Sequence, residues 1–220
     1  MGSNYFDKAM LTFRSEGIFP LLSKGVLKIA SVFFKMHTSL WLVKDLKQEA
    51  QAIENPSDYS VELEDFDAIV EWMKRKNREY PWMYCEKEIA VARENQHVIP
   101  FLKIDNAIVG YTKVAFNKVY IRDYEAIFRL APNKAMFYDT TLLNEFRGKK
   151  LPQYLKKEIF RFLKKRNIEY VYAHIEPWNI ASIKSNRGLG FREVCLNRFI
   201  KILNVKFHSN SPARLLSENR

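Results

Sequence analysis

The chain has 220 residues, of which 47% are hydrophobic and 14% aromatic, enough to bury one core and an additional segment. A net charge of +11 favours anionic partners, namely nucleotide phosphates, nucleic acid, acidic proteins or a membrane surface. Cys85 and Cys195 fit neither the spacing of a metal motif nor that of a redox motif, which favours two ordinary thiols, and no internal repeat is visible.

The N-terminal extension, residues 1–56, is expected to be helical and basic. From Tyr5 to Leu46 apolar residues are interleaved with lysines, and Gly17, Pro20 and Gly25 favour two short helices over one long helix. No run here reaches the roughly 20 apolar residues of a membrane-spanning helix. Two interpretations are open. The apolar face packs on the core or on a second copy in a homodimer, which is the commoner arrangement, or it makes peripheral contact with an anionic membrane.

The first residues lack a charged region followed by an apolar core, so no secretory signal is expected. The two separated thiols suit a reducing compartment. We therefore expect a cytoplasmic protein, at the membrane surface if its N-terminal helices bind lipid.

A linker and then an α/β domain follow this extension. Asn55-Pro56-Ser57 is typical of a linker, which places the domain at residues 57–207 and a polar tail at residues 208–220. Trp72, Trp82 and Tyr84 either line a substrate pocket or, more commonly for such aromatics, pack in the core. The expected elements are a strand at 58–63, a helix around 66–73 capped by Asp65, further helix within 80–95, strands at 98–104 and 107–114 joined by Asp105-Asn106, a strand region at 119–130 and closing strands within 193–207.

The stretch from Phe137 to Lys165 predicts a strand, a basic turn and an amphipathic helix. Residues 137–143 are rich in β-branched and aromatic types, polar residues gather around Gly148, and Pro152 suits the first turn of a helix. The backbone N–H groups and the dipole at the start of such a helix attract anions. We therefore predict a phosphate site, to which positive charge is added by Arg147, Lys149 and Lys150.

Two segments here resemble motifs of the GNAT acyltransferase superfamily. Residues 147–151, Arg-Gly-Lys-Lys-Leu, resemble its coenzyme A pyrophosphate loop, although Lys150 stands at the usual position of the first motif glycine and Pro152 at the Gly/Ala position. Residues 179–182, Asn-Ile-Ala-Ser, followed by Gly-Leu-Gly-Phe at 188–191, resemble its second motif at the expected distance downstream. The resemblance implies a GNAT-like α/β fold with a mixed, mostly antiparallel sheet flanked by helices.

The resemblance also implies the ligands. Acetyl-CoA or another acyl-CoA would supply an acyl group, a small amine would accept it by direct attack in a ternary complex, and no metal is expected. A backbone N–H near Leu142 or Leu143 would polarise the thioester carbonyl. The residues implied in coenzyme binding are Leu142, Leu143, Arg147, Gly148, Lys149, Lys150, Leu151, Asn179, Ser182 and Asn186.

The segment from Glu169 to Ile175 predicts a strand with two different faces. Val171, Ala173 and Ile175 fall on one face, while tyrosines, His174 and Glu176 fall on the other. The resemblance implies that this strand and the one at 137–143 splay apart to admit the acyl-coenzyme. The polar row would then line that opening.

The free energies of the two proton transfers at pH 7 indicate which transfer matters more. An alkylamine with a pKa near 10.4 costs roughly 4–5 kcal/mol to deprotonate at pH 7, whereas protonating a thiolate with a thiol pKa near 8.5 is worth only about 2 kcal/mol. A base therefore matters more than an acid. The candidate bases, acting directly or through water, are Glu176, His174 and Asp139, and for each the alternative is a hydrogen-bonded structural residue.

The acid is harder to assign. Many relatives place a tyrosine at the position of Asn186, which cannot give a proton. Either Tyr138 or Tyr172 substitutes for it, or the thiolate leaves unassisted and is protonated by water.

The central helix carries more positive charge than one pyrophosphate requires. A solvated helix face is the usual explanation, and a contact with the coenzyme 3′-phosphate, an acidic carrier protein or anionic lipid are alternatives. Nucleic acid is not an expected partner, because no motif interleaves aromatics with this charge. We predict an N-acyltransferase; an acyltransferase fed by a carrier protein and a non-catalytic binding module remain alternatives. The positively charged residues of the central helix are Lys156, Lys157, Arg161, Lys164, Lys165 and Arg166.

Overall fold

The computed structural model describes residues 34–48 and 59–217, which belong to two compact units. The larger unit contains residues 38–197 and 210–217, and the smaller contains residues 34–37 and 198–209. Most of the expected N-terminal helices and the expected linker lie outside the described residues. The elements in chain order are β1 Phe34–Asp45, β2 Ser60–Glu62, α3 Phe66–Lys76, α4 Glu86–Glu94, β3 Phe101–Ile104, β4 Ala107–Ala115, β5 Lys118–Ile121, η1 Arg122–Tyr124, β6 Ala126–Arg129, β7 Lys134–Leu142, η2 Asn144–Phe146, α5 Leu151–Lys165, β8 Tyr170–Ile175, α6 Ile180–Gly188, β9 Arg192–Ile202, β10 Val205–His208 and α7 Pro212–Ser217.

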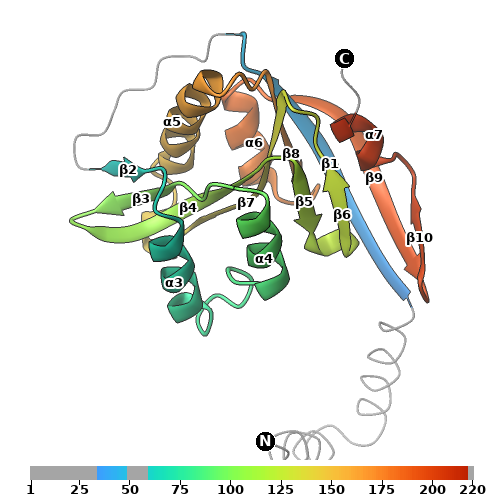
Figure 1. The fold of residues 1–220 in the computed structure, drawn as a ribbon, viewed down its shortest axis with the longest axis horizontal. Coiled ribbons are helices and arrows are strands. Elements are labelled where there is room, and N and C mark those ends of the chain that lie inside the picture. The colour runs from blue at the N-terminus through green and yellow to red at the C-terminus, as the bar shows by residue number, and fades with distance from the viewer. Residues whose placement is uncertain (1–33, 49–58, 218–220) are drawn as a thin grey trace, which may run out of the picture. The chain divides into compact units, whose positions relative to one another are not determined.

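The larger unit is built around a mixed sheet with the strand order β9-β1-β8-β7-β4-β3-β2. β7 and β8 run parallel, whereas β1 with β8, β4 with β7, β3 with β4 and β2 with β3 run antiparallel. Figure 1 shows α5 and α6 on one side of this sheet and α3 and α4 on the other. The expected mostly antiparallel sheet flanked by helices is therefore confirmed.

Alternation along β3 and β4 divides the apolar side chains between two cores. Leu102 and Val109 pack with the buried stripe of α5, which includes Leu155 and Ile159. Phe101, next to Leu102, packs in the other core with α3 and α4, and so does Tyr111. Adjacent strand residues such as Phe101 and Leu102 face opposite sides of a sheet. The register of β3 against β4 shifts beside Leu102, which lets Val109 and Tyr111, two positions apart, enter different cores.

Several predicted elements lie close to their expected positions. Asp65 caps α3 by accepting a hydrogen bond from the Ala68 N–H at 3.0 Å. The turn between β3 and β4 places Asp105 and Asn106 at φ 47° and 63°. Both values fit a two-residue hairpin of the I′ type, which these residue types tolerate without glycine.

The expected helix over residues 34–46 is wrong, because this segment forms β1. Leu40 to Asp45 pair with Ile175 to Tyr170 of β8, which places β1 inside the sheet. The run Leu40-Trp41-Leu42-Val43 is short and continuously apolar, and periodicity alone does not distinguish such a buried strand from a helix. The sheet therefore begins before the expected domain boundary at residue 57, and this part of the expected extension belongs to it.

Two further segments differ from their predictions. Residues 119–130 form a separate hairpin, β5 paired with β6, with the 3₁₀ turn η1 between the two strands. The expected polar tail contains the short helix α7, whose Leu216 is fully buried. The Leu216 carbonyl accepts from the Ala131 N–H at 2.9 Å, and the Leu215 carbonyl accepts from the Lys134 ammonium at 2.8 Å. One buried leucine and two main-chain acceptors thus anchor a stretch whose composition is typical of a frayed end.

The smaller unit contains the hairpin formed by the end of β9 and β10. Ile200 pairs with Phe207, and Leu203 takes a left-handed conformation at the turn, with φ 55°. The closing strands expected within residues 193–207 are confirmed. In the described ranges, no helix is long and apolar enough to cross a membrane.

Candidate active site

The sheet of the larger unit opens between its two central parallel strands. β7 and β8 pair from Lys134 with Tyr170 as far as Phe137 with Ala173. Beyond this point β7 continues along β4, up to Leu142, and β8 continues along β1. The expected splaying of these strands is therefore present, because each follows its outer neighbour.

A β-bulge lies where the two strands part. The register of β4 against β7 shifts between Lys113, opposite Asp139, and Val114, opposite Phe137, so Tyr138 is the extra residue. Such a bulge bends its strand and redirects the following side chains. It contributes to turning the end of β7 away from β8.

A cavity of about 980 Å³ occupies this opening. On the α5 and α6 side it is lined by Arg147, Gln153, Lys156 and Asn186, among others. On the opposite side it is lined by residues of the α3–α4 loop, α4 and the β5–β6 hairpin. These include Trp82, Glu88, Tyr120, Arg122 and Asp123. The cavity thus receives side chains from both layers of the domain, and two ligands can meet across the sheet.

The turn before α5 has the properties of an anion site. Gly148 and Lys150 are left-handed, with φ 82° and 56°, and a side chain at Gly148 would meet no atom within 4 Å. Lys150 is the N-cap of α5, and its side chain does not cap the helix. A helix start with an open approach and flanking cations attracts phosphate groups. The residues of the turn therefore form a site suited to a phosphate group.

The conformation of Lys150 explains its position in the motif. A left-handed residue is the one for which glycine is the usual choice, and a side chain there costs roughly 1 kcal/mol. The lysine keeps this conformation, with φ 56°, and adds a charge that lines the cavity. The lysine at this motif position therefore keeps a backbone conformation that glycine also adopts readily.

The expected coenzyme residues divide into two groups. Leu143, Lys149 and Leu151 do not line the cavity. The Leu143 N–H donates to the Val109 carbonyl at 2.9 Å, so it is not available to polarise a thioester, and Leu151 is buried in the core. The residues that do line the cavity are Leu142, Arg147, Gly148, Lys150, Asn179, Ser182 and Asn186.

Comparison with known proteins agrees with this geometry. The model of the acetyltransferase (GNAT) family matches residues 58–191, more than half of the chain. The chain belongs to the GNAT acetyltransferase family. A search of curated proteins found no match.

Solved structures of the GNAT family share the fold. A GCN5-related N-acetyltransferase from Sphaerobacter thermophilus superposes with a TM-score of 0.55 at 11% identity, covering 82% of this chain and 56% of that chain. A protein from Novosphingobium aromaticivorans named as a GNAT-family acetyltransferase superposes with a TM-score of 0.50 at 16% identity, covering 76% and 64% of the two chains. The chain thus spans about three fifths of these relatives, and at such identities the likeness concerns the fold alone.

Asp139, one of the three expected bases, is tied into a buried ion network. Its carboxylate accepts from the Tyr111 hydroxyl at 2.7 Å and from the Thr141 hydroxyl at 3.1 Å, and it lies 3.1 Å from the Lys113 ammonium. Lys113 is fully buried and also donates to Glu88 at 3.0 Å. Burial opposes the lysine charge, but Asp139 and Glu88 outweigh that effect and raise the pKa of Lys113. Three donors from this GNAT domain therefore surround the Asp139 carboxylate.

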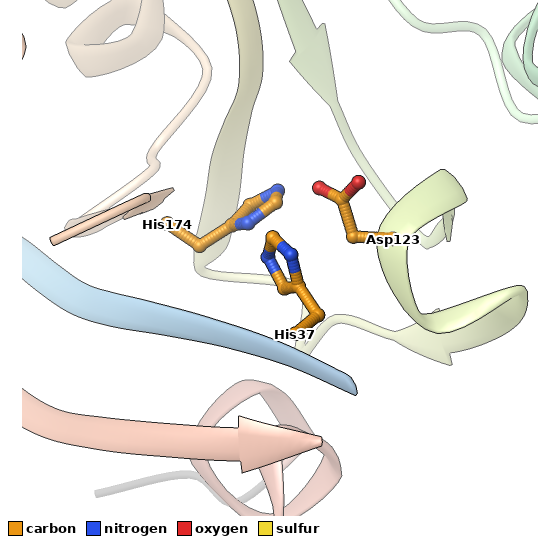
Figure 2. A group of neighbouring side chains, drawn as sticks. All are labelled: His37, Asp123 and His174. Carbon is orange, nitrogen blue, oxygen red and sulfur yellow. The ribbon is translucent and has the colours of Figure 1, made fainter. Parts of the chain in front are cut away.

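His174 occupies the polar face of β8 among aromatic rings. Its ring stacks on Trp41, with centroids 5.6 Å apart, and lies 5.9 Å from the ring of Tyr124. A carboxylate oxygen of Asp123 and a ring nitrogen of His174 lie within 4.8 Å of one another, and Figure 2 shows these two side chains facing each other. Asp123 lies in η1, within the segment 119–130 that was expected to be a strand region, and no motif in that segment pointed to it as a neighbour of His174.

Glu176 is the expected base with the most freedom to act. It follows β8 directly, lines the cavity and is partly exposed. Within residues 34–48 and 59–217, no hydrogen bond or ion pair holds its carboxylate. Its backbone carbonyl accepts from the Asn179 N–H at 2.9 Å, which fixes the chain entering α6. A positioned carboxylate with free lone pairs is what proton abstraction from an amine requires.

The expected alternative acids are poorly placed. Tyr138 lines the cavity, but burial and the nearby Glu88 and Asp139 carboxylates raise the pKa of its hydroxyl well above the usual range. Tyr172 does not line the cavity and is buried, with the Lys134 ammonium 5.3 Å from its ring centroid. Tyr172 thus does not reach the cavity, and Tyr138 holds its proton more tightly than an ordinary tyrosine does.

One of the cations assigned to the solvated face of the central helix is in fact buried. Lys156 is 4% exposed and lines the cavity, whereas Lys157 and Arg161 on the same helix are not buried. Lys156 lies one position after Leu155, so it falls on the edge of the apolar stripe and faces α6. The apolar spacing of α5 contained this signal, because a lysine adjacent to the stripe faces inward when a second helix packs there.

The aromatic residues before β3 have different environments. Trp72 is buried and makes an edge contact with Tyr111, at a centroid distance of 6.2 Å. Trp82 is 49% exposed and lines the cavity, which makes it the pocket residue of this group. Glu88 and Arg122, which the sequence did not single out, form an ion pair next to the Trp82 backbone. The Arg122 guanidinium donates to Glu88 at 3.0 Å and to the Trp82 carbonyl at 3.1 Å.

Proposed function

We propose that this chain transfers an acyl group from an acyl-coenzyme A, acetyl-CoA in the first instance, to a primary amine, by direct attack in a ternary complex. The observation that carries the proposal is the cavity through the split sheet. It joins a cationic helix start on one side to a carboxylate without a partner among the described residues on the other. Family membership supports the reaction class. The donor and the acceptor are our inference.

The turn before α5 would hold the diphosphate of the donor. Arg147, Gly148 and Lys150 line the cavity at this end, and the N-terminus of α5 directs its dipole toward the same point. The pantetheine arm would then enter the opening between β7 and β8, where unpaired strand edges offer backbone hydrogen bonds. The thioester would then lie near Tyr138 and His174, where pairing between the strands has ended.

The amine would approach from the side of α4 and the β5–β6 hairpin. Trp82 and Tyr120 offer apolar walls there, and the carboxylates of Asp123 and Glu176 offer negative charge to a protonated amine. Glu176 would take the proton that the attacking nitrogen loses, directly or through water. Deprotonation of an alkylamine at pH 7 costs roughly 4–5 kcal/mol, so a base at this position supplies a useful part of the barrier.

We favour a free acyl-CoA over an acyl carrier protein as the donor. The cavity presents cations at its coenzyme end, where the diphosphate and 3′-phosphate of coenzyme A would supply matching charge. The exposed cations on the outer face of α5, such as Lys164 and Lys165, are consistent with a solvated surface.

The test has two stages. Thermal unfolding is measured with acetyl-CoA, longer acyl-CoAs, coenzyme A, nucleotides and an acyl carrier protein, because a ligand that binds the folded state raises the melting temperature by mass action. The best donor is then combined with a panel of aminosugars, amino acids, polyamines, peptides and proteins, and release of free thiol is followed. Stabilisation by acyl-CoA and amine-dependent thiol release are expected. A chain that no acyl-CoA stabilises, or that releases no thiol with any amine, contradicts the proposal.

A further inference from the structure

Lys156 is a buried cation in the coenzyme half of the cavity, and the function proposed above gives it no role. Its ammonium donates to the Asn186 side-chain carbonyl at 2.9 Å and lies 5.6 Å from the ring centroid of Phe137. Asn186 in turn donates to the Ser182 carbonyl at 2.8 Å, which fixes its amide with the oxygen toward Lys156. Lys156 and Asn186 are 4% and 1% exposed, so their geometry is set by packing.

The environment of Lys156 is costly for a charge. Among residues 34–48 and 59–217, no carboxylate forms an ion pair with it, and its hydrogen-bond acceptor is a neutral amide. An ammonium removed from water and given one neutral acceptor loses much of its hydration. Burial accordingly lowers the pKa of Lys156 to about 8. A leucine or methionine would join Leu155 and Ile159 in the same helix layer without this cost, so packing alone does not explain a lysine.

The position of the pair suggests its role. Asn186 stands where relatives in the resembling family carry the tyrosine that protonates the leaving thiolate, and an amide cannot release a proton. Lys156 reaches the same place from α5 and donates a hydrogen bond to Asn186, the residue that stands in place of that tyrosine. Glu176, which follows β8, lines the same cavity, so acid and base would reach one thioester from different elements.

We propose that Lys156 protonates the coenzyme A sulfur as it departs, with Asn186 holding the ammonium in place; this rests on the acyl transfer proposed above. The amine nitrogen forms a bond to the carbonyl carbon and passes one proton to Glu176. The carbon–sulfur bond breaks, its electron pair goes to sulfur, and sulfur takes one proton from the Lys156 ammonium. The products are an amide and a neutral thiol. Glu176 then loses its proton to solvent and the neutral Lys156 amine regains one.

The acidity of Lys156 suits this task. An acid is most effective when its pKa is close to that of the group it protonates and to the working pH, and a thiol has a pKa near 8.5. The pKa of Lys156, about 8, lies close to this value, whereas an exposed lysine near 10.4 would give up its proton less readily. Other ionisable groups line the same cavity. They are Lys184 of α6, Tyr138 and Asp139 of β7, His174 and Glu176 at β8, Arg147 and Lys150 of the turn, Glu88 of α4, Tyr120 of β5, and Arg122 and Asp123 of η1.

The first test needs no turnover. Free coenzyme A is bound to the folded chain, and ionisation of its thiol is followed by thiolate ultraviolet absorbance as pH is raised. An ammonium beside the sulfur stabilises the thiolate. We therefore expect the bound thiol to titrate about one unit below its ordinary value near 8.5 in the wild type. Lys156→Met should remove this lowering while coenzyme binding is retained. Equal titration in both chains would overturn the proposal.

The second test separates proton donation from charge. Lys156→Met should reduce kcat by about 100-fold or more at pH 7, the typical effect of losing a general acid. Lys156→Arg keeps the charge but does not release a proton in this range, so it should also be slow. The double variant Lys156→Met, Asn186→Tyr should regain part of the rate by supplying a tyrosine acid. Lys165→Met, on the exposed surface of α5 and outside the cavity lining, removes an equal charge and should leave kcat unchanged.

The outcomes distinguish the two proposals. A wild-type chain that transfers no acyl group refutes the reaction and the acid together. An active wild type whose Lys156→Met variant keeps the same kcat and pH profile refutes only the acid. Full activity of Lys156→Arg would show that charge suffices and would overturn proton transfer. A folded, coenzyme-binding Lys156→Met chain that is slow, and is rescued by Asn186→Tyr, supports the proposal.

Discussion

Phe137 of β7 and Ala173 of β8 form the last pair across the two parallel strands at the centre of the sheet. After this pair the strands separate, and the cavity begins with the same two residues among its lining. The position of the candidate active site therefore follows from strand pairing. β7 stays with β4 through its bulge at Tyr138, β8 stays with β1, and the space between them accepts a ligand.

Replacing Arg147 by alanine should weaken coenzyme A binding by about 10- to 100-fold. A charge-assisted hydrogen bond to phosphate is worth roughly 1.5–3 kcal/mol, and about 1.4 kcal/mol corresponds to a tenfold change in affinity. Isothermal titration calorimetry measures this effect. Lys149→Ala is the matched comparison. Lys149 carries the same charge close to Arg147, but its side chain does not line the cavity, so this variant should lose less affinity for coenzyme A. An equal loss in both variants would indicate general electrostatic attraction in place of a defined contact.

Replacing Glu176 by glutamine should lower kcat by about 100-fold or more while leaving coenzyme binding nearly unchanged. The amide keeps the shape of the side chain but cannot accept a proton from the amine, and general base catalysis typically contributes at least this factor. Steady-state kinetics with the best amine checks the prediction. Glu94→Gln, on an exposed carboxylate at the end of α4, is the control and should retain full activity. Normal turnover of Glu176→Gln would move the role of base to His174.

Replacing Lys150 by glycine should have opposite effects on stability and binding. The left-handed conformation at φ 56° is strained for lysine and relaxed for glycine, so the free energy of unfolding should rise by about 1 kcal/mol or slightly less. Loss of the charge at the cavity should weaken coenzyme binding. Chemical denaturation and calorimetry measure the two effects separately. A variant that is both less stable and unaltered in binding would contradict the structure assigned to this turn.

Replacing Lys113 by methionine should lower the free energy of unfolding by about 3 kcal/mol or more. The change leaves the Glu88 and Asp139 carboxylates close together without the buried ammonium that lies 3.0 and 3.1 Å from them, and breaking a buried ion pair on one side has costs of this size. Urea denaturation provides the measurement. Adding Asp139→Asn should recover part of the loss, because it removes one of the uncompensated charges. No recovery would show that packing around Lys113, and not charge, dominates.

Replacing Lys156 by methionine should stabilise the fold, in contrast to its expected effect on catalysis. The pKa of Lys156 is lowered to about 8 from 10.5, so the unfolded chain binds a proton more tightly than the folded chain does. The wild type therefore carries a penalty of about 3 kcal/mol below pH 8, which disappears as pH rises from 8 to 10.5. The lost hydrogen bond to Asn186 reduces the gain. Unfolding free energies of both chains at pH 7 and pH 10 should show an advantage for the variant that shrinks with pH.

The elements with strong local patterns were predictable from the sequence. α5 combines an apolar stripe with a proline in its first turn, and its observed range Leu151–Lys165 agrees with the prediction. The motif residues Arg147, Gly148, Asn179 and Asn186 line the cavity, although their role in coenzyme binding stays a prediction. In these segments the local signal and the tertiary role coincide.

The remaining features depend on contacts between distant segments. β1 resembles a helix in isolation and becomes a strand because β8 offers it an edge. The ion network joins Glu88, Lys113, Arg122 and Asp139 from four elements, and no spacing in the sequence indicates that they meet. The burial of Lys156 depends in the same way on α6, whose Asn186 accepts its hydrogen bond.

A crystal structure of the chain with coenzyme A provides the most direct test of the proposed site. The diphosphate is expected beside Arg147, Gly148 and Lys150 at the start of α5, and the pantetheine arm between β7 and β8, with its sulfur near Lys156. Coenzyme bound on another surface, or a diphosphate at the turn with the arm directed away from the opening beyond Phe137 and Ala173, would contradict the proposed acyl transfer across the split sheet.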